Sequence, residues 1–448
     1  MRSNGLRLLV AGAWLVTVAL ARAETLTDAL GKVYADNPRL QGGRAALRAA
    51  DEAVPLARST GRPQVTGTAS AAYNAAGDAL PASRQSLSVT QTIYDGGSTR
   101  AATAQAENSA RAEQARQMLL EQQVLLDAIV AFVTVVRDRR ILALAQANEE
   151  WLRLELDATR DREHFGDLTK TDILQAETRQ AAGMAERIAA EGELAVVTAD
   201  YARIFGVPPD DPQMPLLPAG LPVGLEEALA QAEGSWQRQA AGFDMAAAEE
   251  QVAVALAAMK PRLSLGGEVS YVQDGGRDYG SGAGAAIGAT LSMPLYQGGG
   301  DHARVRQSKE LFTQRRYGQD DAQRASESEI TAAWEAGRTA EAQIDSIRRQ
   351  IRTAKLAVEG VRQEAQFGTR SVVDVLDAER ERFGAEVELA KVERDQVVAA
   401  YRLLAAVGRL TARDLGLAVI YDDPEAHRKA TSGRWLGLGA AAESGEQP

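Results

Sequence analysis

The sequence contains an internal repeat with a period near 200 residues, and this repeat constrains the fold more than any other feature. The longest match pairs 165–166 and 172–177 with 367–368 and 374–379, at a constant offset of 202 residues. Three shorter matches occur in the same order along the chain: 26–30 with 225–229, 63–65 with 261–263, and 93–97 with 295–299. Four ordered matches predict a tandem duplication in which both halves build the same elements.

The two copies are joined by a proline-rich segment. Residues 207–224 hold six of the 14 prolines of the chain. Proline fixes φ and lacks a backbone donor, so this stretch can form neither a helix nor a central strand. We therefore predict a first repeat at 24–206, a linker at 207–224, a second repeat at 225–420, and an exposed C-terminal extension at 421–448.

Each copy contains two segments in which apolar and polar residues alternate. In 262–271, 283–295 and 86–94, and more weakly in 64–73, every second residue is apolar over most of the stretch. Alternation over roughly ten residues is typical of the strands of a membrane-spanning barrel. The pattern predicts one hairpin per copy, at 62–94 and 262–296, with loops at 74–83 and 274–282.

Helical periodicity follows each hairpin. Neither 98–163 nor 301–366 contains a proline, and helices of that size would be on the order of 100 Å long. In the second copy Ile344, Ile347 and Ile351 step by three and four residues, as in a coiled-coil seam. We predict long helices at 98–163, 168–206, 301–366 and 371–408, and a shorter helix before each hairpin, the first of them broken near Pro55.

The first residues are typical of a secretory signal peptide. Arg2 and Arg7 precede an apolar stretch at 8–20, and an Ala-Arg-Ala cleavage signal at 21–23 precedes Glu24. Removal of 1–23 takes away three arginines and no acidic residue, which changes the net charge from −11 to −14. We expect an exported protein with no later transmembrane helix, so any entry into a membrane would be through its strands.

Composition excludes several classes of function. The net charge of −11 argues against nucleic-acid binding. The chain has no cysteine, and its three histidines lie far apart in the sequence, so we predict no metal site, no cofactor and no cysteine chemistry. The glycines at 280–284 resemble a phosphate-binding loop, but no Lys-Ser/Thr pair follows, and we interpret them as a loop entering a strand. The chain is therefore expected not to be an enzyme.

The strand count predicts an oligomer. Two hairpins give four strands per chain, too few to close a barrel, and open sheet edges are not tolerated in lipid. A dimer sharing eight strands would have an interior filled by side chains, whereas a trimer sharing 12 would leave a passage. The predicted fold class is thus an α+β membrane protein with a shared 12-stranded barrel above a tube of long helices.

Three segments carry a family resemblance. Residues 367–379, which read F-G-T-R-S-V-V-D-V-L-D-A-E, resemble the G-T-R-x-x-V-D-V-L-D-A segment of TolC channels. Residues 87–97 and 291–299 resemble the strand-to-helix corners of that family, and 401–415 resemble its closing segment. The resemblance covers about 24–420. It implies a homotrimeric duct of the outer membrane whose helices stand in the periplasm. It also implies a periplasmic adaptor (a membrane fusion protein) and an inner-membrane transporter of the ABC or resistance-nodulation-division class as partners.

The resemblance also implies a gate at the periplasmic end. Its acidic constriction falls on Asp374 and Asp377, and the links that hold the closed state fall on Arg370, Thr171 and Asp172. Three-fold symmetry would turn each Asp into a ring of three carboxylates that favours cations. The alternative is that these carboxylates only stabilise helix N-termini. A tyrosine of the family's closed-state links falls on Ala365, so that contact must be missing or replaced, with Phe367 as the neighbouring candidate.

A soluble periplasmic coiled-coil adaptor is the alternative function. It would account for the long helices but not for two pairs of alternating strands. The sequence leaves the cargo open, since proteins and toxic small molecules both fit an exit duct.

Overall fold

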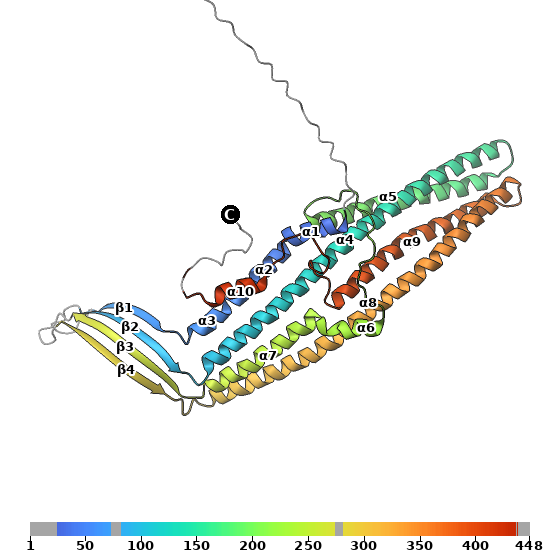
Figure 1. Ribbon diagram of the computed structural model, residues 1–448. Coiled ribbons are helices and arrows are strands. Elements are labelled where there is room, and N and C mark those ends of the chain that lie inside the picture. Colours follow the sequence, from blue (N-terminus) through green and yellow to red (C-terminus); the bar gives the residue numbers. More distant parts are fainter. Residues whose placement is uncertain (1–24, 73–81, 274–280, 436, 438–448) are drawn as a thin grey trace, which may run out of the picture.

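The computed structural model describes residues 25–72, 82–273, 281–435 and 437. The proposed signal peptide at 1–23 and nearly all of the two strand-connecting loops lie outside these residues. The molecule is elongated. The sheet lies at one end, and two turns that each join a pair of helices lie at the other (Figure 1). Two helices run between these ends, α4 (Ser98–His164) and α8 (Gly300–Gln366), each of 67 residues.

The two halves of the chain have matching elements. Before its hairpin the first half has three helices, α1 (Leu26–Asp36), α2 (Pro38–Asp51) and α3 (Ala53–Ser59). The corresponding part of the second half holds α6 (Leu225–Ala230), η1 (Gln231–Gly234) and α7 (Trp236–Ala257). After α4 and α8 come α5 (Lys170–Phe205) and α9 (Val372–Ala406), and the C-terminal region adds α10 (Pro424–Ser432).

Two prolines account for the breaks among the first three helices. Pro55 lacks the amide that would bond to the carbonyl of Asp51, and α2 ends at Asp51. The earlier break, at Asn37, differs from the single predicted break near Pro55. There Pro38 occupies the first position of α2, and the Asn37 side chain accepts a hydrogen bond from the Arg39 amide at 2.9 Å.

The sheet contains β1 (Gln64–Ala72), β2 (Ala82–Tyr94), β3 (Arg262–Gln273) and β4 (Gly282–Ser292), all antiparallel and in sequence order. The pairing of β2 with β3 joins the two hairpins into one sheet. Its register places most of the large apolar residues of the four strands on one face, through pairs such as Val65 with Val89 and Leu87 with Val269. We call this surface, which also contains Ile287 of β4, the apolar face of the sheet.

The opposite face of the sheet is polar. Arg84 of β2 pairs with Glu268 of β3 at 2.9 Å, and the hydroxyls of Thr68 and Ser86 are 2.6 Å apart. A sheet with one apolar and one polar face is suited to separate lipid from water.

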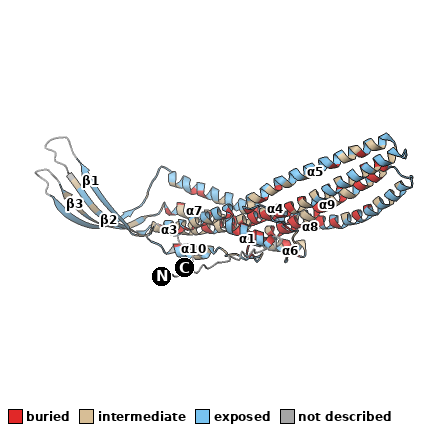
Figure 2. Cartoon of the chain, turned by 90° about the horizontal axis from the view of Figure 1, so that it is seen from above, coloured by how far each residue is buried: buried red, intermediate tan, exposed pale blue. Residues whose placement is uncertain are grey.

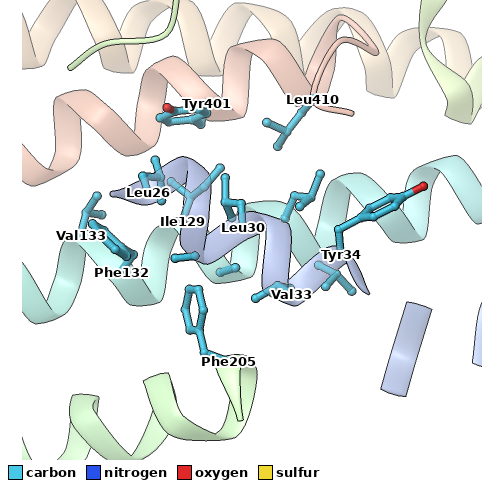
Figure 3. Packing of buried hydrophobic residues seen from close by; sticks show 14 of the residues in the cluster. Leu26, Leu30, Val33, Tyr34, Ile129, Phe132, Val133, Phe205, Tyr401 and Leu410 are labelled. Carbon is cyan, nitrogen blue, oxygen red and sulfur yellow. The ribbon is translucent and has the colours of Figure 1, made fainter. Parts of the chain in front are cut away.

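The main core lies midway along the molecule, where buried residues are concentrated (Figure 2). Leu125, Ile129 and Phe132 of α4 are fully buried. They pack against α1, α5, α9 and the segment after α9 (Figure 3). Among the described residues α4 is the one helix long and apolar enough to cross a membrane, whereas no such helix was predicted after the signal peptide. Half of that apolar stretch is buried, because it supplies this core.

The predicted heptad seam packs α8 against α9. Ile344 and Ile351 are buried against Leu389 and Val392, and Ile347 borders the same cluster. Each long helix therefore has a coiled partner along its outer half, α5 for α4 and α9 for α8 (Figure 1).

The C-terminal region is not simply an exposed extension, so that expectation was wrong for its helix. α10 packs on α2 and α3. His427 Nδ1 lies 3.0 Å from a carboxylate oxygen of the buried Asp51, and an Arg428 guanidinium nitrogen donates to Gln114 of α4. The sequence around His427 and Arg428 does not indicate these partners, because Asp51 and Gln114 are more than 300 residues away.

Candidate functional site

The predicted gate residues lie at the two turns that join α4 to α5 and α8 to α9, at the end of the molecule far from the sheet (Figure 1). The two turns have the same construction. Gly166 and Gly368 have φ of 83° and 74°, a left-handed conformation that favours glycine at a helix C-terminus. The backbone amide of Asp167 donates a hydrogen bond to the carbonyl oxygen of Arg162 at 3.0 Å. In the second turn the amide of Thr369 donates to the carbonyl oxygen of Glu364, also at 3.0 Å. The 202-residue repeat thus preserves the backbone of the turn.

A capping box then starts each returning helix. The carboxylate of Asp172 accepts from the Thr169 amide at 2.9 Å and from its hydroxyl at 2.7 Å. Asp374 accepts from Ser371 in the same way, at 3.0 and 2.8 Å. The hydrogen bonds from Ser371 hold the pKa of Asp374 below its usual value, and nearby Arg370 acts in the same direction. Both carboxylates therefore have a local role in starting a helix.

Arg370 has a partner on its own turn. Its Nε donates to a carboxylate oxygen of Glu364 at 2.9 Å, and this hydrogen bond raises the pKa of the guanidinium. The Asp172 carboxylate is engaged by Thr169, and Thr171 is exposed. Within the chain as described, the expected contact of Arg370 with Asp172 or Thr171 is replaced by these local bonds. A contact between neighbouring subunits stays a prediction.

Asp377 is the predicted gate residue whose side chain connects the two repeats. Its Oδ1 accepts a hydrogen bond from Arg179 of α5 at 2.5 Å, with Arg179 29% and Asp377 57% exposed. No pattern in the sequence predicts this ion pair. In the repeat, Arg179 matches Glu381 and Asp377 matches Gln175, so internal symmetry gives no sign that the two side chains meet.

An apolar cluster lies beside this ion pair. It joins Leu152 and Leu156 of α4 to Val372 and Leu376 of α9 and also contains Ala176 of α5. We call these five residues the tip cluster. The tip cluster and the Arg179–Asp377 pair hold the end of one repeat against the end of the other.

Two aromatic side chains mark the extreme end of the molecule. Phe165 and Phe367 occupy matched positions at the ends of α4 and α8, and they are 80% and 84% exposed. The family's tyrosine is replaced by alanine at position 365. Because Phe367 is exposed, it does not take the place of that tyrosine within this chain. In residues 25–72, 82–273 and 281–435, no group of three or more metal-ligating side chains is brought together.

A family model for outer membrane efflux proteins matches residues 29–205 and 230–409, which correspond to the two repeats. The chain belongs to this outer membrane efflux protein family. The outer membrane efflux protein BepC of Brucella suis is 34% identical over 442 residues, covering 94% of each chain. The outer membrane protein TolC of Escherichia coli is 25% identical over 420 residues, covering 89% of this chain and 85% of TolC.

A solved structure has the same fold. The outer membrane channel CmeC of Campylobacter jejuni superimposes with a TM-score of 0.79 at 15% identity, covering 91% of this chain and 89% of CmeC. Membership of the outer membrane efflux protein family makes this chain an outer-membrane channel subunit with its helices in the periplasm. It is not an enzyme, and the alternative of a soluble adaptor is wrong. Channels of this family work with efflux or secretion machinery.

Proposed function

We propose that three copies of this chain close into one duct, a 12-stranded barrel above a helical tube. The sheet supports this proposal, because β1 and β4 are its edge strands and an open edge is not tolerated in lipid. Three four-stranded sheets joined at these edges would form a barrel with the apolar face outside and the polar face inside. Heat-resistant trimers in the outer-membrane fraction are the expected result of cell fractionation.

The observation that carries the gate proposal is the Arg179–Asp377 ion pair beside the tip cluster. It connects α5 and α9, which come from different repeats, at the periplasmic end of the duct. Three copies would place three such pairs around the axis. In this proposal Asp374 and Asp377 form the acidic constriction, and opening requires the two repeats to separate at their tips.

Contacts between subunits complete the proposed closed state. Arg370 is half exposed in its pair with Glu364, so it has room for a second acceptor on a neighbouring subunit. Thr171 and Asp172 lie at the matching turn of the other repeat and offer hydroxyl and carboxylate oxygens. A guanidinium can bond two such acceptors at once through its fork of donors.

The proposed partners are a periplasmic adaptor and an inner-membrane transporter of the ABC or resistance-nodulation-division class. The helical end is too polar for lipid and the chain has no phosphate-binding loop with its Lys-Ser/Thr pair. Energy for transport must therefore be supplied by another protein. The likeness to BepC favours efflux, and secretion of proteins is the second candidate.

The test uses the opposite charges of the ion pair. Arg179→Ala and Asp377→Ala both break the link, but the first leaves three unpaired carboxylates at the constriction and the second removes them. In planar bilayers we expect Arg179→Ala to increase cation selectivity and Asp377→Ala to decrease it. Equal selectivity in the two variants would refute the acidic ring at Asp377.

A further inference from the structure

The C-terminal helix brings a tryptophan to the foot of the sheet. α10 is fixed by the contacts of His427 with Asp51 and of Arg428 with Gln114, and its Thr431 is fully buried. The residues that follow are thereby directed along α3, towards the point where the chain enters β1 (Figure 1).

Arg62, two residues before β1, holds the segment there. One of its guanidinium nitrogens donates to the Arg434 carbonyl at 3.3 Å. The guanidinium carbon lies 4.5 Å from the centre of the Trp435 ring, which is a cation–π contact. Trp435 is still 68% exposed. Its ring is therefore held on one side and open to its surroundings on the other.

The position of this tryptophan relative to the sheet suggests what surrounds it. Tyr94 ends β2 opposite Leu263, on the apolar face and at the same end of the sheet as Arg62. Tyr94 and Trp435 are both more than half exposed. Aromatic side chains with a polar atom gather where a membrane meets water, since one part of the ring system is apolar and another can be hydrated. Barrels of the outer membrane have such girdles at both interfaces.

We propose that Trp435 and Arg62 form an anchor that inserts into the headgroup region of the phospholipid leaflet facing the periplasm. The ring of Trp435 enters the boundary between headgroups and acyl chains, while the guanidinium of Arg62 reaches phosphate oxygens. α10 thereby ties the helical part of the chain to the membrane surface. This inference rests on the proposed insertion of the apolar face into lipid.

The test measures fluorescence quenching by lipid bromine. The full chain is reconstituted in phosphatidylcholine vesicles whose acyl chains carry bromine at carbons 6 and 7. Beyond residue 23 the chain has four tryptophans, and Trp151, Trp236 and Trp334 lie on α4, α7 and α8. We expect bromine to quench part of the wild-type emission and expect Trp435→Phe to lose that quenching. Trp151→Phe is the matched control and should keep it.

A second variant separates this inference from the membrane proposal. Ile287→Trp, made together with Trp435→Phe, places a tryptophan on the apolar face of β4. Quenching of Ile287→Trp without any quenching at Trp435 overturns the anchor alone. An unquenched Ile287→Trp overturns the insertion of the sheet, and the anchor with it. Arg62→Ala should reduce the quenching at Trp435, because the ring loses its cation–π contact.

Discussion

The Arg179–Asp377 pair gives the sharpest quantitative prediction about the gate. Both side chains are partly exposed, so solvent screens the pair and its contribution is about 0.5–1 kcal/mol in each subunit. Three equivalent pairs in the proposed trimer would favour the closed state by roughly 1.5–3 kcal/mol in total. Since 1.4 kcal/mol corresponds to a factor of ten, breaking all three should raise the ratio of open to closed channels roughly 10- to 150-fold.

The assay is single-channel recording of Arg179→Ala, Asp377→Ala and the double variant in planar bilayers. If the two side chains act through one another, the double variant opens no more often than either single variant. The control is Arg160→Ala. Its pair with Glu177 at 2.8 Å joins α4 to α5 within one repeat, so its loss should leave the open probability unchanged. Additive effects of Arg179→Ala and Asp377→Ala, or equal opening by Arg160→Ala, would contradict the reasoning.

Three further predictions concern other parts of the molecule. Leu376→Ala should destabilise the tip cluster by about 2–4 kcal/mol and raise the open probability, whereas Leu174→Ala, on an exposed face of α5, should have little effect in the same recordings. Burial raises the pKa of the Glu121 carboxyl, so the folded state loses stability as pH rises and this group loses its proton. Glu121→Gln should therefore raise the melting temperature at pH 7 but not in acid, where Glu121 is protonated. Circular dichroism at the two pH values measures this difference. Val89→Lys, on the apolar face, should lower the yield of outer-membrane trimers on gels, at a cost of about 2–4 kcal/mol per chain, while Ser88→Lys on the polar face should assemble. A pH-independent effect of Glu121→Gln, or equal yields from the two lysine variants, would refute the corresponding argument.

The repeat, the hairpins and the long helices could be predicted because each rests on a local pattern. The apolar spacing of Ile344 and Ile351 and the alternation around Leu87 are properties of the sequence itself. Element ends followed the same logic, since glycine and a capping residue mark the turns at Gly166 and Gly368. Local pattern therefore gave the architecture of each half.

Contacts between the halves could not be predicted in this way. Arg179 meets Asp377, and His427 meets Asp51, through packing of elements far apart in the chain. Nothing in the periodicity of one helix indicates which charge on another helix will face it. The predicted contact between Arg370 and Asp172 is the opposite case, because it was predicted but is not formed within one chain. A single chain satisfies both charges locally, and the expected link depends on subunits whose arrangement the sequence does not contain.

The placement of the core has a mechanical consequence. The fully buried part of α4 around Phe132 lies near the middle of the helix, and about 32 residues, or about 48 Å of helix, extend from there to the turn. The core can thus act as a fulcrum, and the outer half of the pair formed by α4 and α5 can act as a lever arm. A tilt of about 10° at the fulcrum displaces the tip by about 8 Å, at the same rise per residue. Small rotations near the core could open a wide aperture while the strands, on the other side of the fulcrum, keep their register.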